Sequence, residues 1–126
     1  MSATQTVLFV CLHGAGMSRM AAAYFNRLAP TDWRAVSAGV DPSETLSSTA
    51  ANLLAGTGAD EFLDQSPPRS IAAVPDAQRV IALRNPAIQF ELAPAEYWDL
   101  AQSAGVPLRE EIRLRVEKLA ESIETH

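Results

Sequence analysis

Residues 7–21 read VLFVCLHGAGMSRMA, and this stretch decides how the rest of the chain is interpreted. Residues 7–12 form a nearly continuous apolar run, which is typical of a β-strand covered on both faces. A loop with two glycines follows, and apolar residues then recur at helical spacing from Ala21 until Pro30 ends the segment. The pattern predicts a strand, a tight loop and a helix, with Cys11 at the end of the strand.

The same alternation continues along the chain. Strand-like runs occupy residues 33–36, 78–83 and 96–100, and helical patterns cover residues 46–54 and the segment from Pro107 to the C-terminal end. Residues 60–76 hold three prolines and are predicted to be mostly loop, with one short helical turn. Strands that alternate with helices indicate an α/β fold, in which helices cover both faces of a parallel sheet.

Composition narrows the class of protein. The 126 residues are 48% hydrophobic and 20% charged, which suits one compact domain over residues 1–126. The net charge of −5 argues against a nucleic acid partner, because there is no basic surplus to neutralise phosphates. Apolar stretches too short to cross a bilayer, and an N-terminus without a basic signal segment, predict a cytoplasmic protein with no membrane partner. Cys11 is the single cysteine, so neither an internal disulfide nor a cysteine-rich metal site is expected.

The loop after the first strand has the features of an anion-binding cradle. Its backbone N–H groups and those of the following helix point inward and favour negative charge. Gly14 and Gly16 allow the close backbone approach that such a loop needs. The same field favours a thiolate at Cys11, and the alternative is a buried structural thiol. Ser18 has two compatible roles, a hydrogen bond to that thiolate or a cap at the helix start.

Here the sequence resembles the low-molecular-weight protein tyrosine phosphatases and their arsenate reductase relatives, over essentially the whole chain. Their first strand ends in a loop C-x-x-x-x-x-R-S, followed by a helix that begins x-M-A. Cys11, Ser18 and Met20 with Ala21 match this pattern. Further matches are VSAG at 36–39, VIAL at 80–83, YWDL at 97–100 and REEIRLRVEKL at 109–119. The resemblance implies a four-stranded parallel sheet of order 2-1-3-4 in a three-layer fold with helices on both faces.

The resemblance also implies a mechanism. The Cys thiolate attacks phosphorus or binds arsenate, and the loop Arg clamps the equatorial oxygens. The Ser hydroxyl hydrogen-bonds the thiolate, and an Asp on a later loop protonates the leaving oxygen. Carried over to this chain, Cys11 is the nucleophile if the protein is active, and no cofactor or metal is expected. The residues expected around the anion are Leu12, His13, Gly14, Ala15, Gly16, Met17 and Ser18.

Two positions depart from the family pattern. Met17 stands where the family has its loop Arg, and Gln102 stands where the general-acid Asp is expected. The nearest guanidinium is Arg19, two residues later, which a helix rotates by about 200° from the Arg position. Arg19 is therefore predicted to be a solvated residue at the helix start. A small external thiol would need only Cys11 for arsenate reduction, whereas a thioredoxin-coupled route needs further cysteines.

The favoured interpretation is a family member that binds a small oxyanion or phosphorylated ligand weakly at the loop from Cys11 to Ser18, with little or no turnover. The alternative is a working tyrosine phosphatase or small-thiol-dependent arsenate reductase, with Arg19 as a relocated clamp. A protein partner and a homodimer are both left open. Other polar and aromatic residues near the motifs are interpreted structurally: His13 as a surface loop residue, Asp99 as a strand-end carboxylate, and Trp33, Tyr97 and Trp98 as core or rim packing.

Overall fold

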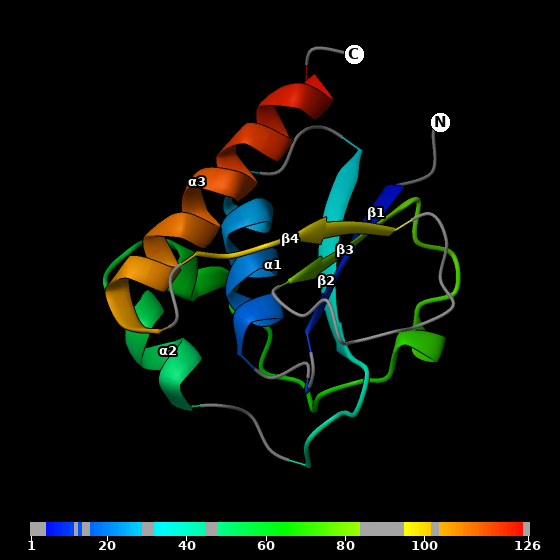
Figure 1. Cartoon of the computed structure of the whole chain (residues 1–126), viewed down its shortest axis with the longest axis horizontal. Coiled ribbons are helices and arrows are strands. Elements are labelled where there is room, and N and C mark those ends of the chain that lie inside the picture. Colours follow the sequence, from blue (N-terminus) through cyan, green and yellow to red (C-terminus); the bar gives the residue numbers. More distant parts are fainter. Residues whose placement is uncertain are drawn as a thin grey trace.

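The computed structural model describes residues 5–11, 13, 16–28, 32–44, 48–83, 95–101 and 104–124. Within them, a four-stranded sheet is the centre of the fold (Figure 1). All its strand pairs are parallel, and the strand order β2-β1-β3-β4 confirms the predicted order 2-1-3-4. The strands are β1 (Gln5–Cys11), β2 (Trp33–Gly39), β3 (Arg79–Leu83) and β4 (Ala95–Trp98).

Helices cover both faces of the sheet, as predicted. Three α-helices lie on one side in Figure 1, where α1 packs between the sheet and α3. A short 3-10 helix, η2, lies on the other side, and a second one, η1, contacts α1. The helices are α1 (Met17–Leu28), α2 (Ser48–Leu54), η1 (Ala59–Phe62), η2 (Ile71–Ala73) and α3 (Gly105–Glu124).

The strand boundaries differ from the sequence prediction in a way that matters for the site. β2 was predicted to end at residue 36, but it continues to Gly39. Residues 37–39 pair with Phe9, Val10 and Cys11 of β1, so the small residues of the VSAG stretch belong to the ladder. β4 is shorter than predicted at its end, because it stops at Trp98 and leaves residues 99 and 100 after the strand. Leu12, the last residue of the predicted first strand, lies outside the described residues.

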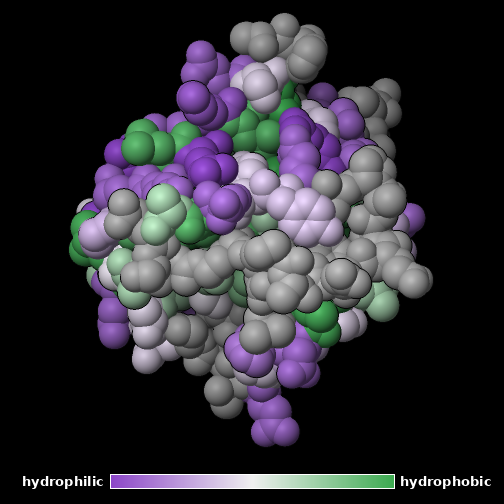
Figure 2. All heavy atoms as spheres, viewed as in Figure 1, coloured by the Kyte–Doolittle hydropathy of each residue, from purple (hydrophilic) through white to green (hydrophobic). Residues whose placement is uncertain are grey.

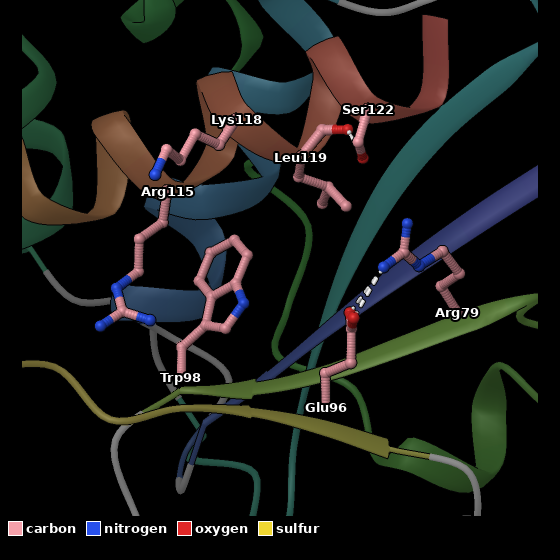
Figure 3. Close-up of a pocket in the computed structure, with 7 residues that line it drawn as sticks. All are labelled: Arg79, Glu96, Trp98, Arg115, Lys118, Leu119 and Ser122. Carbon is pink, nitrogen blue, oxygen red and sulfur yellow. Dashed lines mark hydrogen bonds and ion pairs between the residues drawn. The ribbon is translucent and has the colours of Figure 1, made fainter. Parts of the chain in front are cut away.

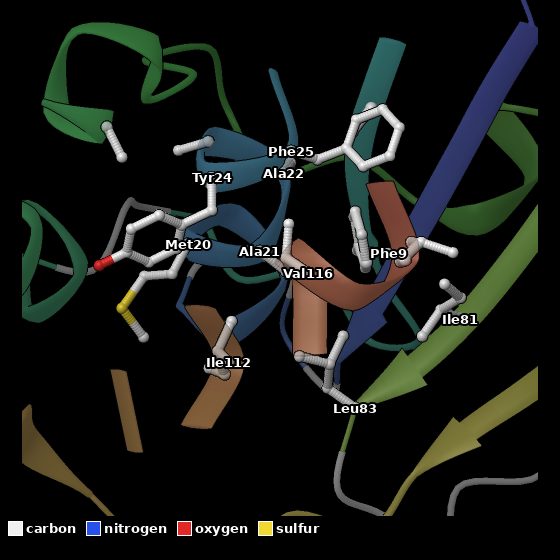
Figure 4. Close-up of a cluster of buried hydrophobic side chains, with 14 of the residues drawn as sticks. Phe9, Met20, Ala21, Ala22, Tyr24, Phe25, Ile81, Leu83, Ile112 and Val116 are labelled. Carbon is white, nitrogen blue, oxygen red and sulfur yellow. The ribbon is translucent and has the colours of Figure 1, made fainter. Parts of the chain in front are cut away.

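The larger core lies between the α-helices and the sheet (Figure 4). Phe9 of β1 meets Phe25 of α1 edge to face, with ring centroids 6.3 Å apart. Every residue of α1 from Ser18 to Phe25 is buried, because the helix is covered by the sheet on one side and by α3 on the other. Alanines at positions 21–23 allow this close approach, and the buried helix places residues 18 and 19 in the interior beside Cys11.

A smaller core covers the opposite face of the sheet. Leu8, Val10 and Ala38 are buried there against Ile71 and Val74 of the η2 region. On the molecular face shown in Figure 2, hydrophilic residues gather over α3, whose outer side is exposed. No helix in the described part of the chain is both long and apolar enough to span a membrane.

Candidate oxyanion site

Cys11 lies at the carboxyl end of β1, in the centre of the sheet. Its carbonyl oxygen accepts a hydrogen bond from the backbone N–H of Val40 at 3.1 Å, so the residue is held by β1 and by the end of β2. The residue is 4% exposed. In open α/β sheets, ligands bind at the carboxyl ends of the strands, at the point where the strand order reverses. In this sheet that point lies between β1 and β3, because the chain crosses from β2 over β1 to reach β3. The structure therefore places the single cysteine at the expected position.

Ser18 is brought directly against the sulfur of Cys11. The distance from Cys11 Sγ to Ser18 Oγ is 3.0 Å, and both residues are buried. Because α1 begins at Met17, Ser18 lies within the first turn and does not act as the N-terminal cap. The helix start is closed by the hydrogen bond from Met20 N–H to the Gly16 carbonyl at 3.0 Å. The contact thus has the geometry in which a hydroxyl can stabilise a thiolate.

Met17 occupies the first position of α1, where the family pattern has its Arg. Its side chain is partly buried and packs against the larger core. A thioether has no N–H donor and no charge, so it cannot bind an oxyanion as a guanidinium does. At this position the chain therefore uses the side chain for packing.

The prediction that Arg19 is a solvated helix-start residue is wrong. Arg19 is 2% exposed and is one of the largest fully buried side chains in the described structure. Its Nη1 donates a hydrogen bond to the backbone carbonyl of Asp64 and lies 4.0 Å from the Asp64 carboxylate. The physical reason is that α1 is buried on both sides, so a cation in its first turn must find its partners inside.

Asp64 is shared between two arginines. Its Oδ2 accepts a hydrogen bond from Arg69 Nη2 at 2.9 Å, and Arg69 also donates to the Ser37 carbonyl at 2.9 Å. Burial alone would raise the pKa of Asp64, but hydrogen bonds from Ser66 and Arg69 outweigh this effect and lower that pKa to about 2. A carboxyl group that is ionised at neutral pH has no proton to donate. Asp64 is therefore unsuited to act as a general acid.

Several neighbouring groups act on the pKa of Arg19. Burial lowers that pKa from its ordinary value and the positive charge of Arg69 lowers it too, whereas Asp64 and Cys11 raise it. Of these four effects, that of Cys11 is the smallest. Arg19, Asp64 and Arg69 together carry one net positive charge.

The loop from Cys11 to Ser18 is described at four positions besides Cys11, which are His13, Gly16, Met17 and Ser18. His13 is exposed, as predicted, and its Nδ1 donates to the Asp41 carbonyl at 2.9 Å, while its own carbonyl accepts from Ser43 N–H at 3.2 Å. These bonds tie the loop to the segment after β2. The other predicted anion-binding residues, Leu12, Gly14 and Ala15, lie outside the described residues, as does Gln102. Their roles stay predictions.

The residues after β4 are placed at the rim of the fold. Asp99 follows β4 directly and is exposed, and its backbone carbonyl accepts a hydrogen bond from Arg115 Nη2 at 3.0 Å. Trp98 packs on Phe9 with ring centroids 5.7 Å apart. Tyr97 is 55% exposed and belongs to the rim rather than the core.

The described residues contain no group of three or more His, Cys, Asp or Glu side chains that could hold a metal ion.

Asp64 and Arg69 are the two residues near the site that the sequence prediction missed. Both lie in the proline-containing segment that was predicted to be mostly loop. A backbone hydrogen bond from Gly39 N–H to the Arg69 carbonyl, 2.9 Å long, fixes this segment against the end of β2. The available signal was Arg19 itself, because a cation inside an otherwise apolar helical stretch requires a carboxylate from elsewhere in the chain.

Comparison with known proteins gives matches among solved structures. Neither the family models nor the curated proteins that were compared match the sequence. An arsenate reductase from Archaeoglobus fulgidus aligns with a TM-score of 0.73 at 30% identity, over 91% of this chain and 98% of that chain. A low-molecular-weight protein tyrosine phosphatase from T. tengcongensis aligns with a TM-score of 0.68 at 22% identity, over 94% of this chain and 99% of that chain.

A third structure is similar but longer. The thioredoxin-dependent arsenate reductase of Corynebacterium glutamicum aligns with a TM-score of 0.80 at 24% identity over 98% of this chain. The present chain spans 64% of the length of that protein. Together with the sheet order and the strand–loop–helix arrangement around Cys11, these similarities define the class: the chain belongs to the superfamily of low-molecular-weight protein tyrosine phosphatases and arsenate reductases.

Proposed function

We propose that this protein binds small oxyanions weakly at the loop from Cys11 to Ser18 and that it hydrolyses phosphate esters or reduces arsenate poorly or not at all. The backbone of such a loop and the start of α1 supply the N–H donors for an anion. The short contact between Cys11 and Ser18 supports a sulfur that is held in place at the base of the loop. The cytoplasmic location expected from the sequence stays a prediction.

The observation that carries the proposal is the position of Arg19. The Arg position of the family is filled by Met17, and the next guanidinium along the chain is buried and engaged with Asp64. To clamp an anion at the loop through Nη1, Arg19 would have to move this atom away from the Asp64 carbonyl and carboxylate. Leaving a buried polar group unsatisfied is costly, so this movement is unfavourable.

The expected loss of rate is large. Removal of one preorganised donor that stabilises transition-state charge costs about 10²–10³ in rate. Loss of general acid catalysis, expected from Gln102, costs about another 10²–10⁴. Even though such losses are not fully additive, little turnover is expected to remain.

One observation favours the alternative, a working phosphatase or small-thiol-dependent arsenate reductase. Cys11 contributes a small effect to the pKa of Arg19, so the guanidinium lies within electrostatic range of the sulfur. In that alternative Arg19 replaces the loop Arg as a clamp, and a carboxylate other than Asp64 replaces the acid. When an anion is bound, Arg19 stays with Asp64 in the proposed function, whereas it contacts the anion in the alternative.

Titration of the protein with inorganic phosphate, arsenate and sulfate by calorimetry separates these functions. We expect weak saturable binding, with a dissociation constant of about 1 mM or higher, because only neutral backbone donors hold the anion. The Arg19→Met variant is expected to weaken binding less than about fivefold, since the lost charge acts at a distance. A loss of tenfold to about a hundredfold, the effect of removing a bidentate clamp, would support the alternative. The absence of saturable binding in the unmodified protein would overturn the proposal.

A further inference from the structure

We propose that a groove between β4 and α3 is a second binding site, for a small organic anion with a flat aromatic ring (Figure 3). The groove has a volume of about 280 Å³. It is here called the β4–α3 groove and is lined chiefly by Arg79, Glu96, Trp98, Arg115, Lys118 and Leu119. None of these residues belongs to the loop from Cys11 to Ser18, so the groove is separate from the candidate oxyanion site.

Trp98 gives the groove an aromatic wall. Figure 3 shows its indole pointing from β4 into the space below α3. The ring is held from behind by Phe9, with centroids 5.7 Å apart, so its position is fixed before a ligand binds. Leu119 lies on the helix side of the same groove. Stacking on a fixed aromatic side chain is favourable for any flat base, because every base has a π-face.

Cationic side chains surround this wall. Arg79 binds Glu96 through both carboxylate oxygens, at 2.7 and 2.9 Å, so the carboxylate of the groove is already neutralised. Arg115 and Lys118 lie three residues apart on α3, which places them on one face of the helix. Arg115 is 3.6 Å from Glu111, whereas Lys118 has no ion pair among the residues that the structure describes.

Positively charged side chains are concentrated in this groove. The protein has ten Lys and Arg residues and a net charge of −5, yet three of the ten cations line this one groove. An oxyanion placed between Arg115 and Lys118 would meet the charge of Lys118 and the part of the Arg115 charge that Glu111 leaves uncompensated, while the attached ring lies against Trp98. A volume of about 280 Å³ suits one ring system with one charged group, which favours a small molecule over an extended acidic peptide.

Adenosine 5′-monophosphate is a suitable probe, with adenosine and inorganic phosphate as matched partial ligands. The ¹H–¹⁵N indole signals of Trp33 and Trp98 report the two tryptophans separately, and Lys118, the only lysine, can be followed by its rate of acetylation. We expect the nucleotide to shift the Trp98 signal saturably, to leave that of Trp33 in place, and to protect Lys118. Adenosine should bind up to about 25-fold more weakly, since it loses contacts with two cations that are each worth up to about fivefold. Phosphate alone should also bind more weakly, because it lacks the ring that stacks on Trp98.

Surface substitutions provide the decisive comparison. Arg115→Gln and Lys118→Gln are each expected to weaken nucleotide binding by up to about fivefold. The matched control Arg113→Gln removes the same charge from α3 but at a residue that pairs with Glu110 and Glu117 outside the groove, and it should change nothing. The proposal is overturned if the Trp98 signal does not move, if adenosine binds as well as the nucleotide, or if an acidic peptide saturates the groove while the nucleotide does not.

Discussion

The Met17→Arg variant is expected to bind inorganic phosphate about tenfold to a hundredfold more tightly than the unmodified protein. A guanidinium at the first position of α1 would be aimed at the loop, and a bidentate charge-assisted contact contributes roughly 1.5–3 kcal/mol. Met17 is only partly buried, so its replacement costs less packing than a core substitution would. Calorimetric titration of both proteins with phosphate and arsenate measures the gain.

A second substitution tests the proposal that Gln102 stands where the family has its general acid. Adding Gln102→Asp is expected to raise turnover of an aryl phosphate only in the Met17→Arg background, because acid catalysis helps little without a bound, polarised phosphoryl group. The Gln102→Asp single variant is the control. If Met17→Arg adds no affinity while Arg19→Ala abolishes binding in the unmodified protein, the positive charge has been relocated rather than lost, and the inference drawn from Met17 is wrong.

The sequence predicted the sheet and the location of Cys11 because both depend on strong local signals. Continuous apolar runs identify buried strands, and the glycines between residues 11 and 17 identify a tight loop. The true end of β2 was missed because Ser37, Ala38 and Gly39 look like a turn, yet their backbones complete the ladder with β1. Pairing across the sheet overrode the local preference of these small residues.

The environment of Arg19 could not be predicted from local pattern. Position 19 follows a serine at a helix start, where a charged residue is normally solvated, and only burial of the whole first half of α1 forces it inside. Its partner Asp64 lies 45 residues away in sequence, in a segment without helical or strand periodicity. A contact of this kind depends on how separate segments pack in three dimensions, so it appears only in the structure.

We infer that the family site is present in this protein but lacks the charged groups that its chemistry needs. Initial rates of hydrolysis of a small aryl phosphate, measured across pH beside a Cys11→Ser control, decide whether this is so. We expect the unmodified protein and the Cys11→Ser variant to be indistinguishable from the buffer background. A robust rate that disappears in Cys11→Ser would show that this inference is wrong, and it would mean that Arg19, despite its burial beside Asp64, stabilises the transition state.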